Sequence, residues 1–230
     1  MTKYELRSTK YNPRGGSHFV LRTSSFVLFC CLVRSEIIDR VAVTIDNQPV
    51  TESQLLEELR VTAFLNAEKP DLSPANRRRT AGRLVEQTLI RREMELMHDT
   101  GPEGAEIEEA LKTAKSRFAG QAAFERELQA YGIGAGVLDR ALARQTAALR
   151  FIELRFRPQV QVQEVEVRQY YETVYLAECQ RKQLRPASFE EARAQCQEAL
   201  AQQRVDKQVD AWLADMKGRT RIRYTEAAFQ

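Results

Sequence analysis

Residues 38–56 read IDRVAVTIDNQPVTESQLL, and this stretch predicts a strand, a tight turn and a capped helix in succession. In residues 41–45, Val and Ile alternate with Ala and Thr, which is the period-two pattern of a strand. Residues 46–49 (DNQP) then turn the chain. Thr51, with Gln54 three positions later, has the pattern of a capping box, so a helix is expected to begin here.

A helix and a strand are also predicted near the C-terminus. Residues 188–217 have an amphipathic pattern, and Ser188 with Glu191 gives their start a second capping box. Residues 219–224 (RTRIRY) alternate polar and apolar residues, which predicts a short strand. Each of these two strands needs a partner for its backbone groups, so we expect them to pair with one another.

The segments between these strands predict a mainly α fold. Ser73 is expected to cap a helix with Pro74 at its first position, where the missing N–H is not needed. The expected helices cover residues 51–66, 73–98, 103–118, 121–131, 135–157, 163–179 and 188–217. The expected fold class is therefore mainly α, with about seven helices and short N- and C-terminal strands that pair.

Both ends of the chain, together with residues 164–172 (EVEVRQYYE), resemble the SurA-type periplasmic chaperones and the related PpiC or parvulin-type foldases. The last stretch is similar to the E-V-x-x-Y-Y-E helix that precedes the isomerase domain in that family. The resemblance covers most of the chain from Glu36 and implies a SurA N-terminal-like chaperone domain over residues 36–230. In that domain, a helical module (residues 36–180) is completed by the C-terminal helix and strand (residues 188–225).

The same resemblance implies a holdase that binds unfolded polypeptides, notably outer-membrane β-barrel proteins in the periplasm. Isomerase-bearing members carry a parvulin domain with active-site histidines after the Tyr-Tyr-Glu helix. Here only residues 176–188 separate Tyr175 from Phe189, so prolyl isomerase catalysis is not expected. A prolyl isomerase and a non-enzymatic assembly scaffold remain the alternatives.

The composition favours binding over catalysis. The chain has two histidines, His18 and His98, so a His-based triad or a zinc site of the usual His/Cys type is not expected, and no cofactor is implied. Gly132, Gly134 and Gly136 follow a predicted helix and not a strand, so they indicate a helix C-cap and hinge, not a dinucleotide site.

Residues 1–35 have the order of an export signal. Basic residues precede a short apolar run, FVLFCCLV at residues 26–33, and Ser35 precedes a possible cleavage site. That run is too short for a permanent membrane span. We therefore expect a periplasmic protein, with a mis-assigned start codon or a weak membrane anchor as the alternatives.

Nucleic acid is not an expected partner. Residues 1–35 hold six of the 35 basic residues but only one of the 32 acidic residues, so the remainder of the chain is slightly acidic. The Arg-rich run at residues 77–92 is interleaved with Glu and is expected to be a solvated helix face.

Aromatic side chains are the candidate peptide-binding groups, because amphipathic aromatics can bind varied extended peptides. The candidates are Phe118, Phe124, Tyr131, Tyr170, Tyr171 and Tyr175. For any one of them, a place in the core is the alternative, and it is favoured over a place in a cleft. Cys179 and Cys196 are expected to be free and buried, with a disulfide between them as the alternative.

We predict that the protein is exported and cleaved near Ser35, because the basic segment, the apolar run and the cleavage site occur in the order that export requires. Intact-mass analysis of the periplasmic fraction should give a chain that begins near Glu36. Recovery of the full-length chain from the cytosol would contradict export.

Overall fold

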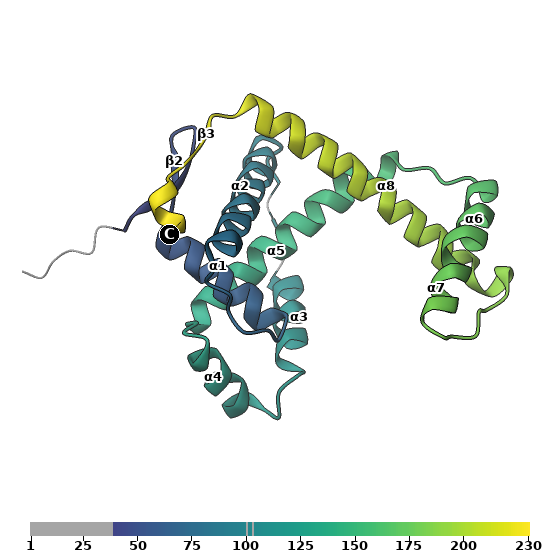
Figure 1. Ribbon diagram of the computed structural model, residues 1–230, viewed down its shortest axis with the longest axis horizontal. Helices are drawn as coiled ribbons and strands as arrows, with labels where there is room; N and C mark the ends of the chain where they lie inside the picture. Colours follow the sequence, from purple (N-terminus) through teal and green to yellow (C-terminus); the bar gives the residue numbers. More distant parts are fainter. Residues whose placement is uncertain (1–38, 100, 103) are drawn as a thin grey trace, which may run out of the picture. The chain divides into compact units, whose positions relative to one another are not determined.

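The N-terminal strand lies at the centre of a small antiparallel sheet (Figure 1). The computed structural model describes residues 39–99, 101–102 and 104–230, so the expected leader and its cleavage site lie outside the described residues. The strands are β1 (Val41–Ile45), β2 (Gln48–Thr51) and β3 (Ile222–Tyr224), in the order β2-β1-β3. Ile45 lies opposite Ile222, and Val43 lies opposite Tyr224, which confirms the expected pairing of the two predicted strands.

β2 was not expected, because residues 48–49 were predicted to belong to a turn. The turn is tighter than predicted and consists of Asp46 and Asn47, with Asp46 in the left-handed region at a φ of 52°. Pro49 is accommodated because β2 is an edge strand. An irregularity in register between Val41 and Val43 breaks the simple alternation, so adjacent residues of β1 are both buried.

The helices follow the predicted order closely. They are α1 (Glu52–Leu65), α2 (Pro74–Leu96), α3 (Gly104–Lys115), α4 (Gln121–Ala130), α5 (Ala135–Phe156), α6 (Glu164–Tyr170), α7 (Leu176–Arg181) and α8 (Phe189–Arg219). α6 and α7 are joined by a π-helical turn, Tyr171–Tyr175, so the described residues form seven helical segments and the mainly α fold class is confirmed. Both predicted capping boxes, at Thr51 and Ser188, are present.

The π-helical turn is the one departure within a predicted helix. Tyr171 and Tyr175 stack with their ring centroids 5.3 Å apart. The Tyr171 hydroxyl donates to the Ala187 carbonyl at 2.7 Å, and the Ala187 N–H donates to the Tyr175 hydroxyl at 3.4 Å. These contacts join the π-helical turn to the segment before α8. The periodicity of the sequence does not predict them.

The C-terminal residues complete the core beneath the sheet. A 3₁₀ turn, Glu226–Phe229, follows β3, and Phe229 is only 4% exposed. Phe229 packs in one cluster with Val43 and Ile45 of β1 and with Val85 and Leu89 of α2. Further along the chain, α8 packs against α2, α5 and α6. Among the described residues, no helix is long and apolar enough to cross a membrane.

The Arg-rich run on α2 is only partly a solvated helix face: Arg78, Arg79 and Arg91 are exposed, as predicted, but several of its arginines also bind other elements. Arg78 pairs with Glu226 at 2.6 Å and lies over the Tyr224 ring at 4.8 Å. Arg77 pairs with Glu52 at 3.3 Å. Arg92 donates to the Asp46 carboxylate at 2.8 Å and to the Ile45 carbonyl at 2.7 Å. These guanidinium groups therefore tie α2 to α1, to the hairpin and to the C-terminal turn.

We predict that Phe229→Ala lowers the free energy of unfolding by about 3 kcal/mol, because a buried aromatic side chain is replaced by a cavity. Urea denaturation measures the change, and Gln230→Ala, at an exposed position, is the control. Deleting residues 218–230 should destabilise the fold further, since β1 also loses its partner strand. Unchanged unfolding of both variants would show that the C-terminal residues do not complete the core.

We predict that Asp46→Asn makes stability less dependent on pH. The Arg221 N–H and then the Arg92 side chain donate to the Asp46 carboxylate, and these bonds lower its pKa. A lowered pKa means that the carboxylate stabilises the fold above its unfolded pKa of about 4 and loses this effect as pH falls through the folded value. Asn also accepts the left-handed conformation that residue 46 adopts, so the substitution isolates the charge.

Urea denaturation of both proteins at about pH 7 and about pH 3 tests this prediction. The wild-type protein should be the more stable at neutral pH, and the difference should shrink in acid. A difference that stays constant between the two pH values would show that the Asp46 charge does not contribute.

Candidate functional site

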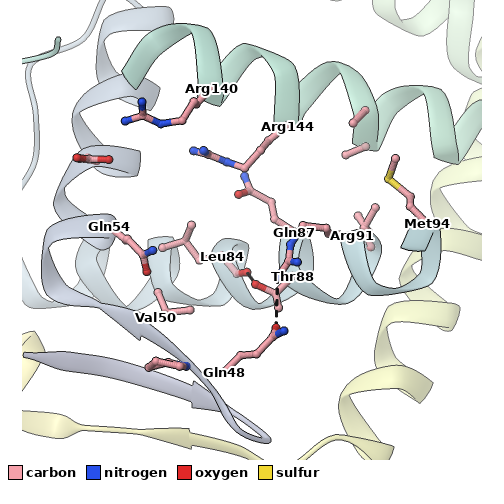
Figure 2. Close-up of a pocket in the computed structure, with 15 residues that line it drawn as sticks. Gln48, Val50, Gln54, Leu84, Gln87, Thr88, Arg91, Met94, Arg140 and Arg144 are labelled. Carbon is pink, nitrogen blue, oxygen red and sulfur yellow. Dashed lines mark hydrogen bonds between the residues drawn. The ribbon is translucent and has the colours of Figure 1, made fainter. Parts of the chain in front are cut away.

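A cavity of about 740 Å³ lies between the β-hairpin, α1, α2 and α5 (Figure 2). Its apolar lining comes from three of these elements. The apolar residues are Val50 of β2, Leu84, Ile90 and Met94 of α2, and Ala147 and Ala148 of α5. The volume is in the range of sites that hold small ligands or a few side chains.

Amide side chains surround the apolar part of the cavity. Gln48 comes from β2, Gln54 from α1 and Gln87 from α2. The Oε1 atoms of Gln48 and Gln54 already accept hydrogen bonds within the protein, so these two amides offer their Nε2 donors to a peptide backbone, while Gln87 offers its Oε1 acceptor. This lining therefore suits a ligand that presents apolar side chains and main-chain polar groups together.

Gln87 has an unused acceptor. Its Nε2 donates to the Glu58 carboxylate at 3.0 Å. Its Oε1 is buried and accepts no hydrogen bond from the described residues. A buried polar atom without a partner is destabilising, and a donor supplied by a ligand removes that penalty.

The charged residues of the lining are three arginines and one glutamate, Arg91, Arg140, Arg144 and Glu57, and Pro49 and Thr88 complete it. Arg91 pairs with Glu95 at 2.7 Å, and Arg144 pairs with Glu58 at 3.4 Å. Arg140 and Glu57 are therefore the two charged groups of the lining that make no ion pair with a described residue. Figure 2 shows Arg140 and Arg144 extending from the same side of α5 over the cavity.

The hairpin side of the cavity is held in place by α2. Arg91 and Arg92 both donate to the Gln48 Oε1, each at 3.2 Å, and Arg92 also binds the turn at Asp46. Figure 2 shows the contact between Gln48 and Arg91. Gln48 is thereby fixed at the rim, so its position depends on the same arginine that fixes the hairpin.

The chemistry of the lining is that of a binding site. Amides, guanidinium groups and a carboxylate supply hydrogen bonds and charge, and the lining contains no His or Cys. His98 lies outside it, exposed after the end of α2. Among the described residues, no group of three or more His, Cys, Asp or Glu is arranged to hold a metal ion.

The first three predicted peptide-binding aromatics lie together, away from the cavity lining. Phe118, Phe124 and Tyr131 pack around Phe64 of α1, with ring centroids 5.5–6.0 Å from that of Phe64. Phe124 is buried, and the Tyr131 hydroxyl donates to the Glu68 carbonyl at 2.8 Å. These contacts place the three rings in the packing of α1, α4 and α5.

The other three predicted aromatics form a second cluster, which also lies outside the cavity lining. Tyr170, Tyr171 and Tyr175 pack with Val167 against α8, where Cys196 is buried. The structure therefore brings the six candidates together in two groups of three, and neither group contributes to the cavity.

Both cysteines of the described chain are free and buried, as expected from the sequence. Burial raises the pKa of the Cys196 thiol, and the nearby Cys179 adds to this shift. A raised pKa leaves less thiolate at neutral pH, so Cys196 is poorly suited to act as a nucleophile.

Sequence analysis did not identify the cavity, because its lining is spread over β2, α1, α2 and α5. Its amides and arginines look like ordinary surface residues of amphipathic helices. The recurrence of Gln at residues 48, 54 and 87, close to predicted apolar faces, is the only signal in the sequence, and it is weak without the fold.

The predicted glycine C-cap after α4 is confirmed at Gly132. It follows α4 with a φ of 66°, and Gly134 is the N-cap of α5.

Comparison with known proteins assigns no family to this arrangement. No protein-family model matches the sequence, and the search of curated proteins finds no match for it.

Proposed function

We propose that the protein is a holdase-type periplasmic chaperone that binds segments of unfolded polypeptide, including outer-membrane β-barrel proteins, without isomerase catalysis. The observation that carries this proposal is the cavity with an apolar lining and three amide side chains. The resemblance of residues 36–230 to SurA-type chaperones points to the same function.

An unfolded client presents two kinds of group that need different surroundings. Its apolar side chains are stabilised by contact with the apolar lining formed by β2, α2 and α5. Its backbone N–H and C=O groups lose water on binding and must find partners. Gln48, Gln54 and Gln87 supply such partners without reading a particular side chain, which is what a chaperone with many clients requires.

The binding is expected to be weak. A disordered segment loses conformational freedom when it is held, and this loss offsets much of the contact energy. The cavity is also only large enough for a few side chains, so a single site has little apolar area to bury. Dissociation constants in the micromolar range follow, and weak binding allows clients to be released.

An assembly scaffold is the second candidate, because α5 also carries exposed apolar side chains. Leu149 and Leu154 are 58% and 62% exposed, and they line a second hollow of about 510 Å³. Exposed apolar residues of this kind occur where a partner protein binds. This alternative assigns the binding function to the surface of α5 and not to the cavity.

We predict that the purified mature protein suppresses aggregation of an unfolded β-barrel protein, and that Ala148→Phe weakens this protection. Ala148 lines the cavity, so a Phe ring at this position takes up space that a client side chain needs. Ala122→Phe, on the exposed surface of α4, is the matched control and should protect as the wild-type protein does. Light scattering during dilution from urea measures protection, and thermal unfolding checks that both variants are folded.

Equal protection by the two variants would exclude the cavity as the client site. Absence of protection by the wild-type protein would leave the scaffold as the better candidate. A proline-containing reporter peptide should isomerise at its uncatalysed rate, and catalysed isomerisation would instead support the foldase alternative.

A further inference from the structure

Arg140 is a charged group of the cavity rim that has no partner among the residues that the structure describes. Arg91 and Arg144 are each paired with a glutamate, Glu95 and Glu58 respectively. Arg140, in contrast, makes no ion pair or side-chain hydrogen bond with any of the described residues. It is exposed on α5, one helical turn before Arg144, and Figure 2 shows it extending over the cavity.

The unused acceptor of Gln87 belongs to the same cavity, on a side chain that comes from α2. Figure 2 shows its amide extending from α2 toward Arg144 of α5. The buried Oε1 requires an N–H or O–H donor, while the exposed guanidinium group of Arg140 is available to pair with an anion. A ligand that satisfies both must therefore carry a hydrogen-bond donor and a negative charge, with apolar groups between or beside them.

We propose that the cavity selects client segments in which an acidic residue neighbours the apolar residues. The apolar side chains contact Val50, Leu84 and Met94. A backbone N–H of the segment donates to the Gln87 Oε1, and its Asp or Glu carboxylate pairs with Arg140. This inference rests on the proposed function and adds to it the class of sequence that is bound best.

Other anionic ligands fit the cavity less well. A nucleic-acid phosphate or the phosphate of an anionic lipid can pair with Arg140, but the phosphodiester group itself has no donor, so the Gln87 Oε1 needs a donor from another part of such a ligand. A peptide has a donor at nearly every residue. The combination of an apolar lining, an unused acceptor and an unpaired cation therefore favours an acidic, apolar polypeptide segment.

Glu57 opposes this selection. It is the only carboxylate of the cavity lining, and it is exposed on α1. Because Arg91 and Arg144 are each paired with a glutamate, Arg140 is the arginine of the lining that is left to pair with an anion. If the charge of the rim governs selection, removal of the Glu57 charge should strengthen the binding of an acidic segment. Loss of the Arg140 charge should weaken it, so the two substitutions are expected to change the affinity in opposite directions.

The test uses three fluorescent peptides that share one apolar sequence and differ at one position, which is Asp, Asn or Lys. Fluorescence anisotropy with the whole mature protein at low ionic strength gives the dissociation constants. The Asp peptide should bind about threefold more tightly than the Asn peptide, and the Lys peptide more weakly than both, in keeping with an exposed ion pair. Added salt should reduce these differences.

Arg140→Gln should bring the ratio of the Asp and Asn dissociation constants to about one, while Arg140→Lys should retain part of the preference. Arg126→Gln is the matched control, because Arg126 is exposed on α4 and its side chain bonds only to the carbonyl of Ala122. It should leave the ratio unchanged. Glu57→Gln should increase the ratio. Arg140 has no partner to lose, so folding of its variants is expected to be normal.

Each outcome decides between the proposals. Equal binding of the Asp and Asn peptides, or a preference that survives in Arg140→Gln, would overturn this inference and leave the chaperone function in place. Failure of all three peptides to bind would instead overturn the proposed function of the cavity. Binding of phosphate-containing vesicles in preference to every peptide would show that the anion is a lipid headgroup.

Discussion

The pairing of β1 with β3 is the interaction on which the rest of the structure depends. Backbone hydrogen bonds extend it on both sides, since the Asp46 N–H donates to the Arg221 carbonyl and the Thr225 N–H donates to the Ala42 carbonyl, at 2.8 Å and 2.9 Å. This pairing positions the C-terminal turn so that Phe229 covers the side chains of β1 and α2. The short strand β1 thus gains hydrogen bonds and apolar cover from Ile222–Tyr224 and Glu226–Phe229, at the other end of the chain.

The cavity is a consequence of the same arrangement. The hairpin is fixed on one edge by β3 and on its turn by Arg92, and Gln48 of β2 is bound by Arg91 and Arg92 near the end of α2. α5 packs against α1 and α2 and supplies the other wall. The polar groups of the lining are therefore presented by rigid elements, while two of them, the Gln87 Oε1 and the Arg140 guanidinium group, are left without partners among the described residues. The same contacts that stabilise the hairpin against α2 therefore also position the lining of the cavity.

Much of the fold could be predicted from the sequence, because local signals agree with the tertiary structure. The capping boxes at Thr51 and Ser188 and the proline after Ser73 fixed three helix starts, and the alternating patterns at both ends identified the strands that pair. β2 was missed because Pro49 is unfavourable in most strands and is tolerated here only at an edge. The role of the arginines on α2 was missed because their partners, such as Glu226, are distant in sequence.

The candidate site was less predictable than the fold. Aromatic residues were chosen because aromatics contribute strongly to binding, but the same property makes them core residues, and the structure places the six candidates in two packed clusters. The lining of the cavity consists instead of amides, arginines and small or aliphatic residues from four elements. Only the three-dimensional arrangement distinguishes Gln87 and Arg140 from the many other polar residues of the helices.

Site-specific photo-crosslinking tests most directly whether clients bind in the cavity. A photo-reactive residue is placed at Gln54, on the rim, or at Gln121, an exposed glutamine of α4 outside the cavity, and each protein is irradiated with an unfolded β-barrel client. The client should be captured from residue 54 and not from residue 121. Equal capture from both positions, or capture only from residue 121, would contradict binding in the cavity.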